Sequence, residues 1–558
     1  MAARRNRFAR ISTCMLNGCE GVEAIMEISI LPGLPTVEIV GLCDSSVRES
    51  RERVRASIRQ IGYEFPSARV TVGIFPAYLH KSGSSFDLPL ALGILLASGQ
   101  IRCSDKRPIL AFGELTLTGE IRNTPGAIAK LASIRDPEQF RLIIPLENKS
   151  EAEIIGIKAE CVSCLRDAIC SMGTGSESLF GCKNSIYSSN DNPLMNDAHR
   201  ISTDLTRDQG IMPENSFLGV DENADQVIDF SCLKGQEKAA RALVLSAAGM
   251  HNLLLTGSPG SGKTTAARIL RGILPQMSRM EKIEYLKLAG TGRILSEIEI
   301  KSDLRPFRYV HHSCTVKRMI GDAGRSIPGE LALSANGILF LDEMAEFSPR
   351  VLDMLRQPLE MKCEAYSPKD QSFIFPSRFL LVGAMNPCRC GRLLDSPSSC
   401  SCSVLQRRQY DGKISGPILD RIDLFCEMYH LKRKGLYDSI SQEFGCDSAR
   451  IREEIRACWS VQFDRCRDSG IRPVLNGEAD GFRINDLFRI SRKVLEYTVL
   501  AAEKTGISAR GLNKVLRVSR TIADLSGEMD MSVSHVSEAL QFRNKKSGSN
   551  SGEYKFQT

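Results

Sequence analysis

Apolar and polar residues alternate over residues 1–172 in short segments that predict a mixed α/β domain. The runs VEIVGL and ARVTVGIFP, which begin at Val37 and Ala68, have the length and β-branched content of strands. The segment from Ser45 to Gly62 carries apolar residues at helical spacing among many charges, which predicts an amphipathic helix. DLPLALGILLASG, from Asp87, predicts a buried helix, and GELTLTGEIR, with its central glycine, predicts a hairpin.

The pattern changes several times after this domain. Residues 173–223 are rich in Ser, Asn, Asp and Gly with little periodicity, which favours a polar linker or an irregular extension of either neighbour. Strands and helices alternate again over residues 224–430, as a parallel sheet requires. Residues 431–545 predict a helical lid, and residues 546–558 are polar and predict a disordered tail. The sequence therefore predicts a multidomain α/β protein.

One stretch, HNLLLTGSPGSGKTTAARIL from His251, predicts a strand, a glycine-rich turn and a helix in succession. Its centre satisfies G-x-x-x-x-G-K-[ST], in which glycines let backbone N–H groups turn toward phosphate oxygens. Lys263 would reach the β and γ phosphates, the Thr264 hydroxyl would ligate Mg²⁺, and the helix N-terminus adds positive potential. The residues predicted to bind the nucleotide are Gly257, Ser258, Pro259, Gly260, Ser261, Gly262, Lys263, Thr264 and Thr265.

Two later apolar runs end in polar residues. GILFLDE, from Gly337, ends in Asp342 and Glu343, and RFLLVGAMN, from Arg378, ends in Asn386. Parallel sheets collect ligand groups at the carboxyl ends of their strands, so we expect these side chains beside the phosphate loop. Asp342 would then hold Mg²⁺, Glu343 would polarise the attacking water, and Asn386 would orient water or contact the γ phosphate. Taken alone, each residue fits an ordinary solvated strand end equally well.

The amino-acid composition favours a globular protein over a membrane-spanning or secreted one. A chain of 558 residues with 42% hydrophobic and 25% charged residues is typical of a multidomain globular protein. The longest apolar stretch, from Leu88, is too short to span a membrane, and no apolar segment follows the basic N-terminus, so we expect a cytoplasmic protein. The 19 cysteines are odd in number, which favours reduced thiols. The net charge of +7 permits a nucleic-acid partner without demonstrating one.

The phosphate loop, FLDE at residues 340–343 and AMNPC at residues 384–388 together resemble an AAA+ ATPase. Further segments narrow this resemblance to the magnesium-chelatase-like AAA+ family, and within it to the ComM/YifB-like proteins. These segments are HHS at 311–313, PGELALSANGILFLDEMAEF at 328–347, LRQPLE at 355–360 and SGPILDRIDL at 415–424. The resemblance implies a Lon-C-terminal/S5-like α+β N-terminal domain, a parallel-sheet P-loop core and a helical lid.

The resemblance also implies roles for particular residues. Asn386 resembles the sensor-1 residue, Arg421 in ILDRIDL the arginine finger, and Arg510 in SAR the sensor-2 arginine over the γ phosphate. With Lys263 and Glu343, they complete the predicted catalytic set. An arginine finger stabilises charge on the neighbouring subunit's nucleotide, so the resemblance implies a ring, a homo-hexamer. The activity it implies is Mg²⁺-dependent ATP hydrolysis by a DNA helicase that promotes branch migration while single-stranded DNA is integrated in natural transformation.

Two other functions stay open. An ATPase motor of the metal-chelatase type would share the core, although such subunits lack the Lon-like domain. An ATP-dependent protease would need a serine and a lysine: Ser85 lies where the Lon family carries its nucleophile, but TPGAIAKL places Ile128 at the lysine position. Lys130 is two residues further on, and on a helix it would face elsewhere. The N-terminal domain is therefore predicted to be proteolytically inactive.

Two loops of the core carry further candidate chemistry. Residues 361–375 occupy the place of a hairpin that points into the pore of related motors, but their few basic residues do not favour contact with a DNA backbone. A CxC…CxC cluster follows Asn386, and four thiolates on one loop could hold a structural Zn²⁺, although reduced cysteines need no ligand. For His311 and His312, polar contacts are favoured over a metal. The cluster consists of Cys388, Cys390, Cys400 and Cys402.

Overall fold

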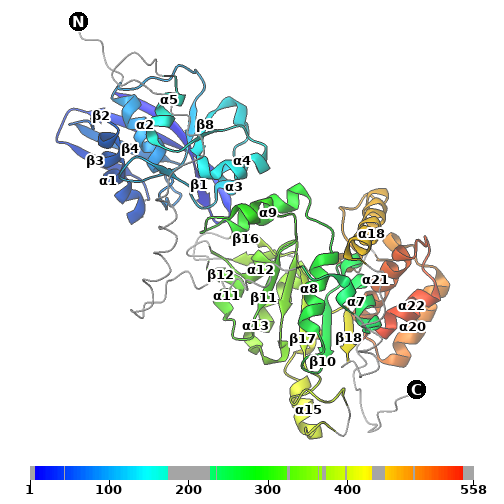
Figure 1. Ribbon diagram of the computed structural model, residues 1–558. Coiled ribbons are helices and arrows are strands. Elements are labelled where there is room, and N and C mark those ends of the chain that lie inside the picture. Colours follow the sequence, from blue (N-terminus) through cyan, green and yellow to red (C-terminus); the bar gives the residue numbers. More distant parts are fainter. Residues whose placement is uncertain are drawn as a thin grey trace, which may run out of the picture.

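The chain folds into an N-terminal α/β region, a parallel-sheet core and a C-terminal helical region (Figure 1). The computed structural model describes residues 7–42, 44–173, 227–233, 235–322, 327–361, 363–366, 373–395, 399–429, 447–479, 481 and 484–543. The predicted linker, apart from residue 173, and the predicted tail lie outside these residues. The mixed α/β class, the parallel sheet and the helical C-terminal region are confirmed.

A seven-stranded mixed sheet, in the order β3-β4-β2-β1-β5-β8-β9, forms the centre of the N-terminal region. Its longest pairing joins β1 and β2, which run antiparallel along their whole lengths. The buried helix α2 packs against this pair so closely that a Cβ atom on Gly93 would collide with Ile28. The strands are β1 (Phe8–Asn17), β2 (Glu20–Leu31), β3 (Thr36–Val40), β4 (Arg69–Phe75), β5 (Ile109–Ala111), β8 (Arg141–Pro145) and β9 (Glu160–Val162).

The helices of this region cover the sheet, and a small hairpin lies beside it. The two predicted strands correspond to β3 and β4, the two predicted helices to α1 and α2, and the predicted hairpin to β6 and β7, so these predictions are confirmed. The elements are α1 (Ser45–Gln60), α2 (Asp87–Ala97), β6 (Glu114–Leu115), β7 (Ile121–Arg122), α3 (Ala127–Ala132), α4 (Lys149–Ile155) and α5 (Leu165–Ser171).

The core is a five-stranded sheet in the order β11-β14-β17-β10-β18, with every neighbouring pair parallel. Thr256 of β10 lies opposite Met385 of β17, and Leu341 of β14 lies opposite Gly383. Three carboxyl ends therefore meet at one edge of the sheet. The strands are β10 (Leu253–Gly257), β11 (Phe307–Val310), β14 (Ile338–Leu341), β17 (Leu380–Met385) and β18 (Leu424–Met428).

Helices and two short strand pairs complete the core. The helices are α7 (Glu237–Gly249), α8 (Lys263–Ile273), α9 (Arg279–Ala289), α10 (Glu297–Lys301), α11 (Val316–Ile320), α12 (Glu330–Leu333), α13 (Pro349–Met354), α14 (Arg356–Met361), α15 (Val404–Asp411) and α16 (Gly416–Leu419). The pairs are β12 (Gly321–Asp322) with β13 (Ile327–Pro328), and β15 (Cys363–Tyr366) with β16 (Phe373–Pro376).

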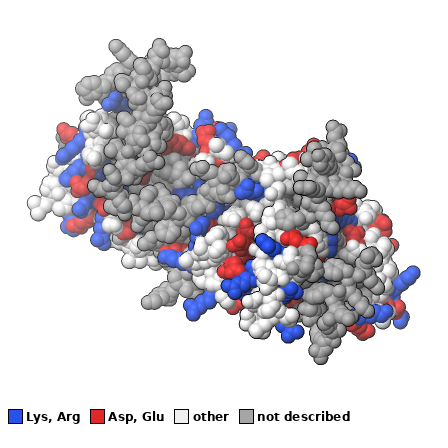
Figure 2. Space-filling model, turned by 60° about the horizontal axis from the view of Figure 1, so that its bottom comes forward, with Lys and Arg blue, Asp and Glu red and all other residues white. Residues whose placement is uncertain are grey.

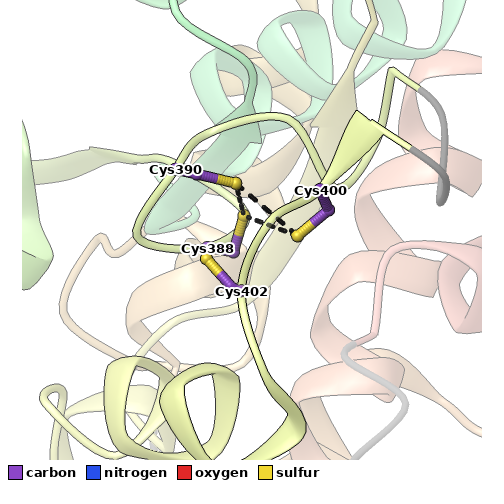
Figure 3. Close-up of side chains that lie close together, drawn as sticks. All are labelled: Cys388, Cys390, Cys400 and Cys402. Atoms are coloured by element: carbon purple, nitrogen blue, oxygen red, sulfur yellow. Dashed lines mark hydrogen bonds between the residues drawn. The ribbon is translucent and has the colours of Figure 1, made fainter.

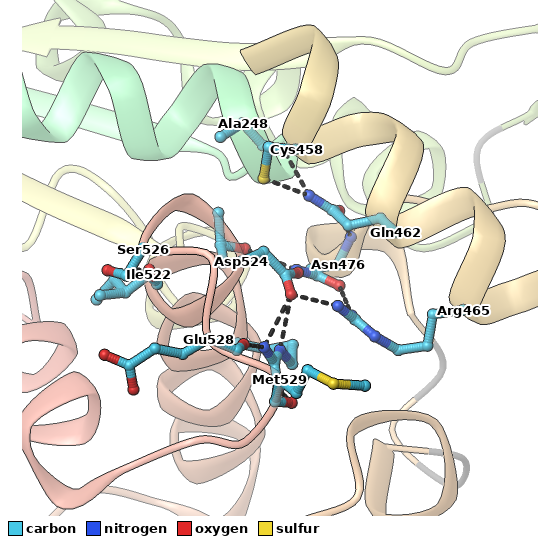
Figure 4. A network of polar contacts seen from close by, with 12 residues as sticks. Ala248, Cys458, Gln462, Arg465, Asn476, Ile522, Asp524, Ser526, Glu528 and Met529 are labelled. Atoms are coloured by element: carbon cyan, nitrogen blue, oxygen red, sulfur yellow. Dashed lines mark hydrogen bonds and ion pairs between the residues drawn. The ribbon is translucent and has the colours of Figure 1, made fainter. Parts of the chain in front are cut away.

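The C-terminal helices gather on the β18 side of the sheet (Figure 1) and share one apolar cluster with α7, α8 and β10. Polar contacts reinforce this junction (Figure 4): Asp524 pairs with Arg520 and Arg465, and Gln462 donates to the Ala248 carbonyl oxygen at the end of α7. The helices are α18 (Ser448–Asp468), α19 (Ile484–Phe488), α20 (Arg492–Thr505), α21 (Ala509–Leu525) and α22 (Val533–Gln541).

The N-terminal region contacts the core through α3 and α4, which face α9. Ile128 of α3 is buried in a small apolar cluster with Leu286 of α9. Arg279 donates to the Ile154 carbonyl oxygen at 3.0 Å. Apolar and polar contacts therefore join the two regions. Among the described residues, no helix combines the length and apolarity that a membrane span needs.

Candidate functional site

The phosphate loop joins β10 to α8 at the carboxyl edge of the parallel sheet. Gly260 and Gly262 have φ angles of +80° and +88°, a left-handed conformation that glycine adopts without steric cost. A Cβ atom on Gly257 would lie 2.6 Å from the Met428 carbonyl oxygen of β18. The glycines are therefore needed for the tight turn and for the close approach of the two strands. This is the strand, turn and helix that the sequence predicts.

Lys263 opens α8 and folds back over the loop. Its Nζ donates to the carbonyl oxygens of Gly257 at 2.7 Å and Ser258 at 3.0 Å, and to Asn386 Oδ1 at 3.3 Å. Burial lowers the pKa of Lys263, while the carboxylates of Asp342 and Glu343 raise it. The ammonium group thus lies between the loop, the end of β17 and two acids, where it would meet a bound phosphate.

Thr264 and Asp342 lie together as the predicted Mg²⁺ site requires. The Thr264 hydroxyl donates to Asp342 Oδ2 at 3.3 Å, and Tyr309 donates to the same oxygen at 3.0 Å. The Glu343 backbone N–H donates to Asp342 Oδ1 at 2.9 Å, so both carboxylate oxygens are held. A hydroxyl and a carboxylate are the oxygen ligands that Mg²⁺ prefers beside a nucleotide. The pattern of strand ends did not reveal Tyr309, which comes from the neighbouring strand β11.

Glu343 has a different environment from Asp342. Its φ angle of +51° is unusual for a residue with a side chain, and the side chain is 53% exposed. His312, which follows β11, places Nδ1 3.3 Å from Glu343 Oε2. The adjacent His311 bonds Ser313 instead, so the two histidines make polar contacts as expected. An exposed carboxylate with one neighbour is free to meet a water molecule, which a catalytic base requires.

The two predicted arginines lie outside this group of residues. Arg421 donates to the carbonyl oxygens of Arg356 at 3.1 Å and Pro417 at 2.6 Å, and it pairs with Glu360. Arg510 is exposed in the first turn of α21, and its guanidinium makes no hydrogen bond or ion pair with another described residue. Within the part of the chain that the structure describes, neither arginine contacts the phosphate loop. Their catalytic roles stay predictions.

The residues of the alternative protease site do not form a dyad. Ser85 is buried, and Ile128 packs against α9. Burial lowers the pKa of Lys130 to about 8, and its Nζ donates to Thr124 Oγ1 at 3.0 Å and lies over the Phe112 ring. Among the described contacts, none joins Lys130 to Ser85. In the described contacts, Lys130 is therefore bonded to Thr124 and not to Ser85.

The four cysteines predicted as a metal site lie together beside the phosphate loop (Figure 3). Their sulfur atoms are within 4.8 Å of one another, and among the described residues they are the one group of three or more metal-ligating side chains at such distances. Asp395, between the two cysteine pairs, accepts a hydrogen bond from Ser258 Oγ at 2.7 Å. Only the fold reveals this contact between the cysteine loop and the phosphate loop.

On the face in Figure 2, the Lys and Arg residues that the structure describes lie interspersed with Asp and Glu, so this face carries no continuous basic stripe. The predicted hairpin is present as β15 paired antiparallel with β16, from Cys363 opposite Pro376 to Tyr366 opposite Phe373. A continuous basic stripe would have indicated phosphate contacts.

Comparison with known families covers all three regions. Residues 229–436 match the family described as magnesium chelatase, subunit ChlI, and residues 26–148 match the family described as subunit ChlI of Mg-chelatase. Residues 445–543 match magnesium chelatase, subunit ChlI C-terminal. The matched segments therefore include the phosphate loop, both acids and both predicted arginines.

Individual relatives are similar over most of the chain. The chain is 34% identical to the competence protein ComM of Haemophilus influenzae over 527 residues, which are 94% of this chain and 95% of the relative. It is 33% identical to YifB of Salmonella typhimurium over 522 residues, 93% of each. The magnesium-chelatase 38 kDa subunit of Rhodobacter capsulatus is 29% identical over 180 residues, 29% of this chain and 51% of that subunit.

Proposed function

The chain belongs to the magnesium-chelatase-like family, in its ComM/YifB-like branch, and on this basis we propose that it is an AAA+ ATPase that hydrolyses ATP with Mg²⁺. The observation that carries the proposal is the meeting of four side chains at one sheet edge. Lys263 lies 3.3 Å from Asn386, and Thr264 lies 3.3 Å from Asp342. Polar residues that merely end separate strands in solvent would not need to contact the phosphate-loop residues Lys263 and Thr264 in this way.

The geometry supports a role for each residue. Lys263 would bind the β and γ phosphates, while Thr264 and Asp342 would hold Mg²⁺, and the ion would supply positive charge near the transferred phosphoryl group. Glu343, exposed beside them, accepts the proton of the attacking water. Asn386 positions that water or the γ phosphate from the end of β17.

Two arginines complete the proposed site. Arg421 acts as the finger on the nucleotide of the adjacent subunit, in a homo-hexameric ring. Arg510 acts from the helical lid, where its exposed guanidinium is available to a γ phosphate. The N-terminal region is proposed to be a Lon-like domain without proteolytic activity, because Lys130 bonds Thr124.

We propose DNA as the substrate on which this motor acts. The similarity to a competence protein extends over 94% of the chain, whereas the similarity to a magnesium-chelatase subunit covers 29%. The proposed activity is that of a cytoplasmic helicase that promotes branch migration while single-stranded DNA is integrated. An ATPase of the metal-chelatase type is the alternative, and it is supported by the family matches of all three regions, each described by a magnesium-chelatase subunit.

A strand-displacement assay on forked and three-stranded DNA tests the proposal. The purified chain should unwind DNA with ATP and Mg²⁺, and Glu343→Gln should bind nucleotide but neither hydrolyse ATP nor unwind. ATP hydrolysis without any unwinding would contradict the helicase and favour the metal-chelatase alternative. Casein cleavage that Ser85→Ala abolishes would instead support a protease.

A further inference from the structure

The four cysteines have the arrangement of a tetrahedral thiolate site. The Cys388 sulfur lies 3.4 Å from that of Cys390 and 3.6 Å from that of Cys400, and the latter two are 3.6 Å apart. Four sulfurs bound to one zinc ion at about 2.3 Å would be separated by about 3.8 Å, the edge of a tetrahedron. The sulfur of Cys402, in the second pair of cysteines, lies within 4.8 Å of the other three sulfurs (Figure 3). The spacing suits a single ion rather than a multinuclear cluster.

A tight turn follows the first pair of cysteines. Gly391 makes this turn with a φ angle of +78°, and its N–H donates to the Cys388 carbonyl oxygen at 3.0 Å.

The same loop presses against the phosphate loop at two points. A Cβ atom on Gly391 would lie 2.7 Å from Pro259 Cδ, so only glycine permits this approach. Asp395 accepts a hydrogen bond from Ser258 Oγ at 2.7 Å. Gly391 and Asp395 both lie between the two cysteine pairs, so whatever fixes the cysteines also fixes these two contacts.

We propose that the four cysteines bind one structural zinc ion, which holds residues 388–395 and 399–402 together against the phosphate loop and thereby supports nucleotide binding. Binding converts four thiols to thiolates and releases their protons, and it involves no change of oxidation state. The ion would bridge the end of β17, which carries Asn386, and the start of α15. The supporting effect on nucleotide binding rests on the proposed ATPase function, whereas the metal site does not.

Metal analysis tests the site directly. The full chain, purified without chelator, should contain one zinc per chain by plasma mass spectrometry, and Cys400→Ser should reduce this content to a small fraction. Cys232→Ser, at an exposed cysteine outside the cluster, is the matched control and should keep the zinc. The proposal is overturned if the wild-type chain refolded with zinc binds none, if iron occupies the site, or if the four thiols form disulfides.

Nucleotide affinity tests the coupling. Asp395→Ala should keep one zinc per chain but raise the KM for ATP about three- to tenfold with little change in kcat, because it removes a single hydrogen bond. Asp395→Asn, which keeps an acceptor oxygen for Ser258, should retain near wild-type KM. Chelator-treated wild-type chain should lose affinity for a fluorescent ATP analogue and regain it when zinc is restored. Unchanged affinity after zinc removal would overturn the coupling even if the metal site exists.

Discussion

Asp342 and Glu343 end the same strand but are held differently. Asp342 accepts hydrogen bonds from Thr264, Tyr309 and the Glu343 backbone, so its carboxylate is fixed toward α8. Glu343 is half-exposed, and His312 is its one described side-chain neighbour within ion-pair distance. A fixed carboxylate suits a metal ligand, and an accessible one suits a base. These different surroundings are compatible with the metal-ligand role proposed for Asp342 and the base role proposed for Glu343.

Replacing His312 should affect turnover rather than binding. His312→Ala removes the imidazole whose Nδ1 lies 3.3 Å from Glu343 Oε2. The Glu343 carboxylate, which is proposed to orient the attacking water, then loses the side chain that holds its position. We expect kcat for ATP to fall about tenfold with KM little changed, which is less than the roughly hundredfold or more that a positioned general base contributes, because Glu343 itself remains. His311→Ala is the control, because His311 bonds Ser313 instead. Equal effects of both substitutions on kcat would contradict a specific role for His312.

His251 should make the stability of the junction between core and helices depend on pH. Burial lowers its pKa from 6.5 to about 4, and its Nε2 shares a hydrogen bond with Thr521 Oγ1 of α21. Between these pH values the unfolded chain binds a proton that the folded chain excludes. The free energy of unfolding should therefore fall as pH decreases from 6.5 to about 4, by about 3 kcal/mol at most.

Urea unfolding followed by the fluorescence of Trp459, whose Nε1 donates to the Ala247 carbonyl oxygen, measures this dependence. His251→Gln has no group that titrates in this range, so it should flatten the pH profile. A wild-type midpoint that stays constant from pH 7 to pH 4.5 would contradict the prediction.

Elements with a strong local pattern are predictable from the sequence. The turn between β10 and α8 is specified by Gly260 and Gly262, and α2 is specified by its continuous apolar run. The long pair of β1 and β2 is not, because β1 lacks a regular alternation of exposed and buried positions and each strand also pairs with a distant strand of the same sheet, β1 with β5 and β2 with β4. An element can be predicted from its own residues when its conformation requires a particular residue type, as glycine is required in the turn between β10 and α8.

Some contacts within the site could likewise be predicted from the sequence, and others could not. Lys263, Thr264, Asp342 and Asn386 could be predicted because parallel strands end at one edge. Tyr309 could not, because its contact with Asp342 depends on β11 lying beside β14, which no local pattern states. The contact between the cysteine loop and the phosphate loop, Ser258 with Asp395, could not be predicted either, because it joins residues that are far apart in the sequence.

The buried ion pairs of Asp524, with Arg465 of α18 and with Arg520 of its own helix α21, should be essential for the helical region (Figure 4). The side chains of Asp524 and Arg520 are 0% and 2% exposed, and Asn476 donates to Asp524 Oδ2 at 2.8 Å. Asp524→Ala would leave two arginines without their shared carboxylate, and we expect a loss of about 3–5 kcal/mol of stability. Asp464→Ala, in an exposed pair with Arg467 on α18, should change stability little.

Chemical denaturation of both variants gives the comparison. Similar midpoints for the two variants would show that the buried pair contributes no more than the exposed one. The Asp524 variant should also weaken the link between the helices and the core, because Asn476, which donates to Asp524, also donates to Thr521, and Thr521 is hydrogen-bonded to His251 of the core.

Arg421 decides whether the molecule works alone or in a ring. Within one chain it is bound to Arg356, Pro417 and Glu360, and none of its described contacts reaches the phosphate loop. An arginine that serves its own nucleotide would have to leave all three partners and cross to the other residues of its site. An arginine that serves the next subunit would also have to leave these partners, because the Arg421 side chain is only 14% exposed within one chain. Action in cis and action in trans are therefore distinguished by their effects on mixed assemblies.

Mixing two inactive variants distinguishes these cases. Arg421→Ala should bind ATP normally but lose kcat by about a thousandfold or more, since an arginine finger contributes that much. Glu343→Gln lacks the base but keeps its finger. If the finger acts in trans, co-assembly gives interfaces in which an intact Glu343 meets an intact Arg421, and a fraction of ATPase activity returns. If it acts in cis, no chain in the mixture has a complete site, and activity stays at the level of the separate variants.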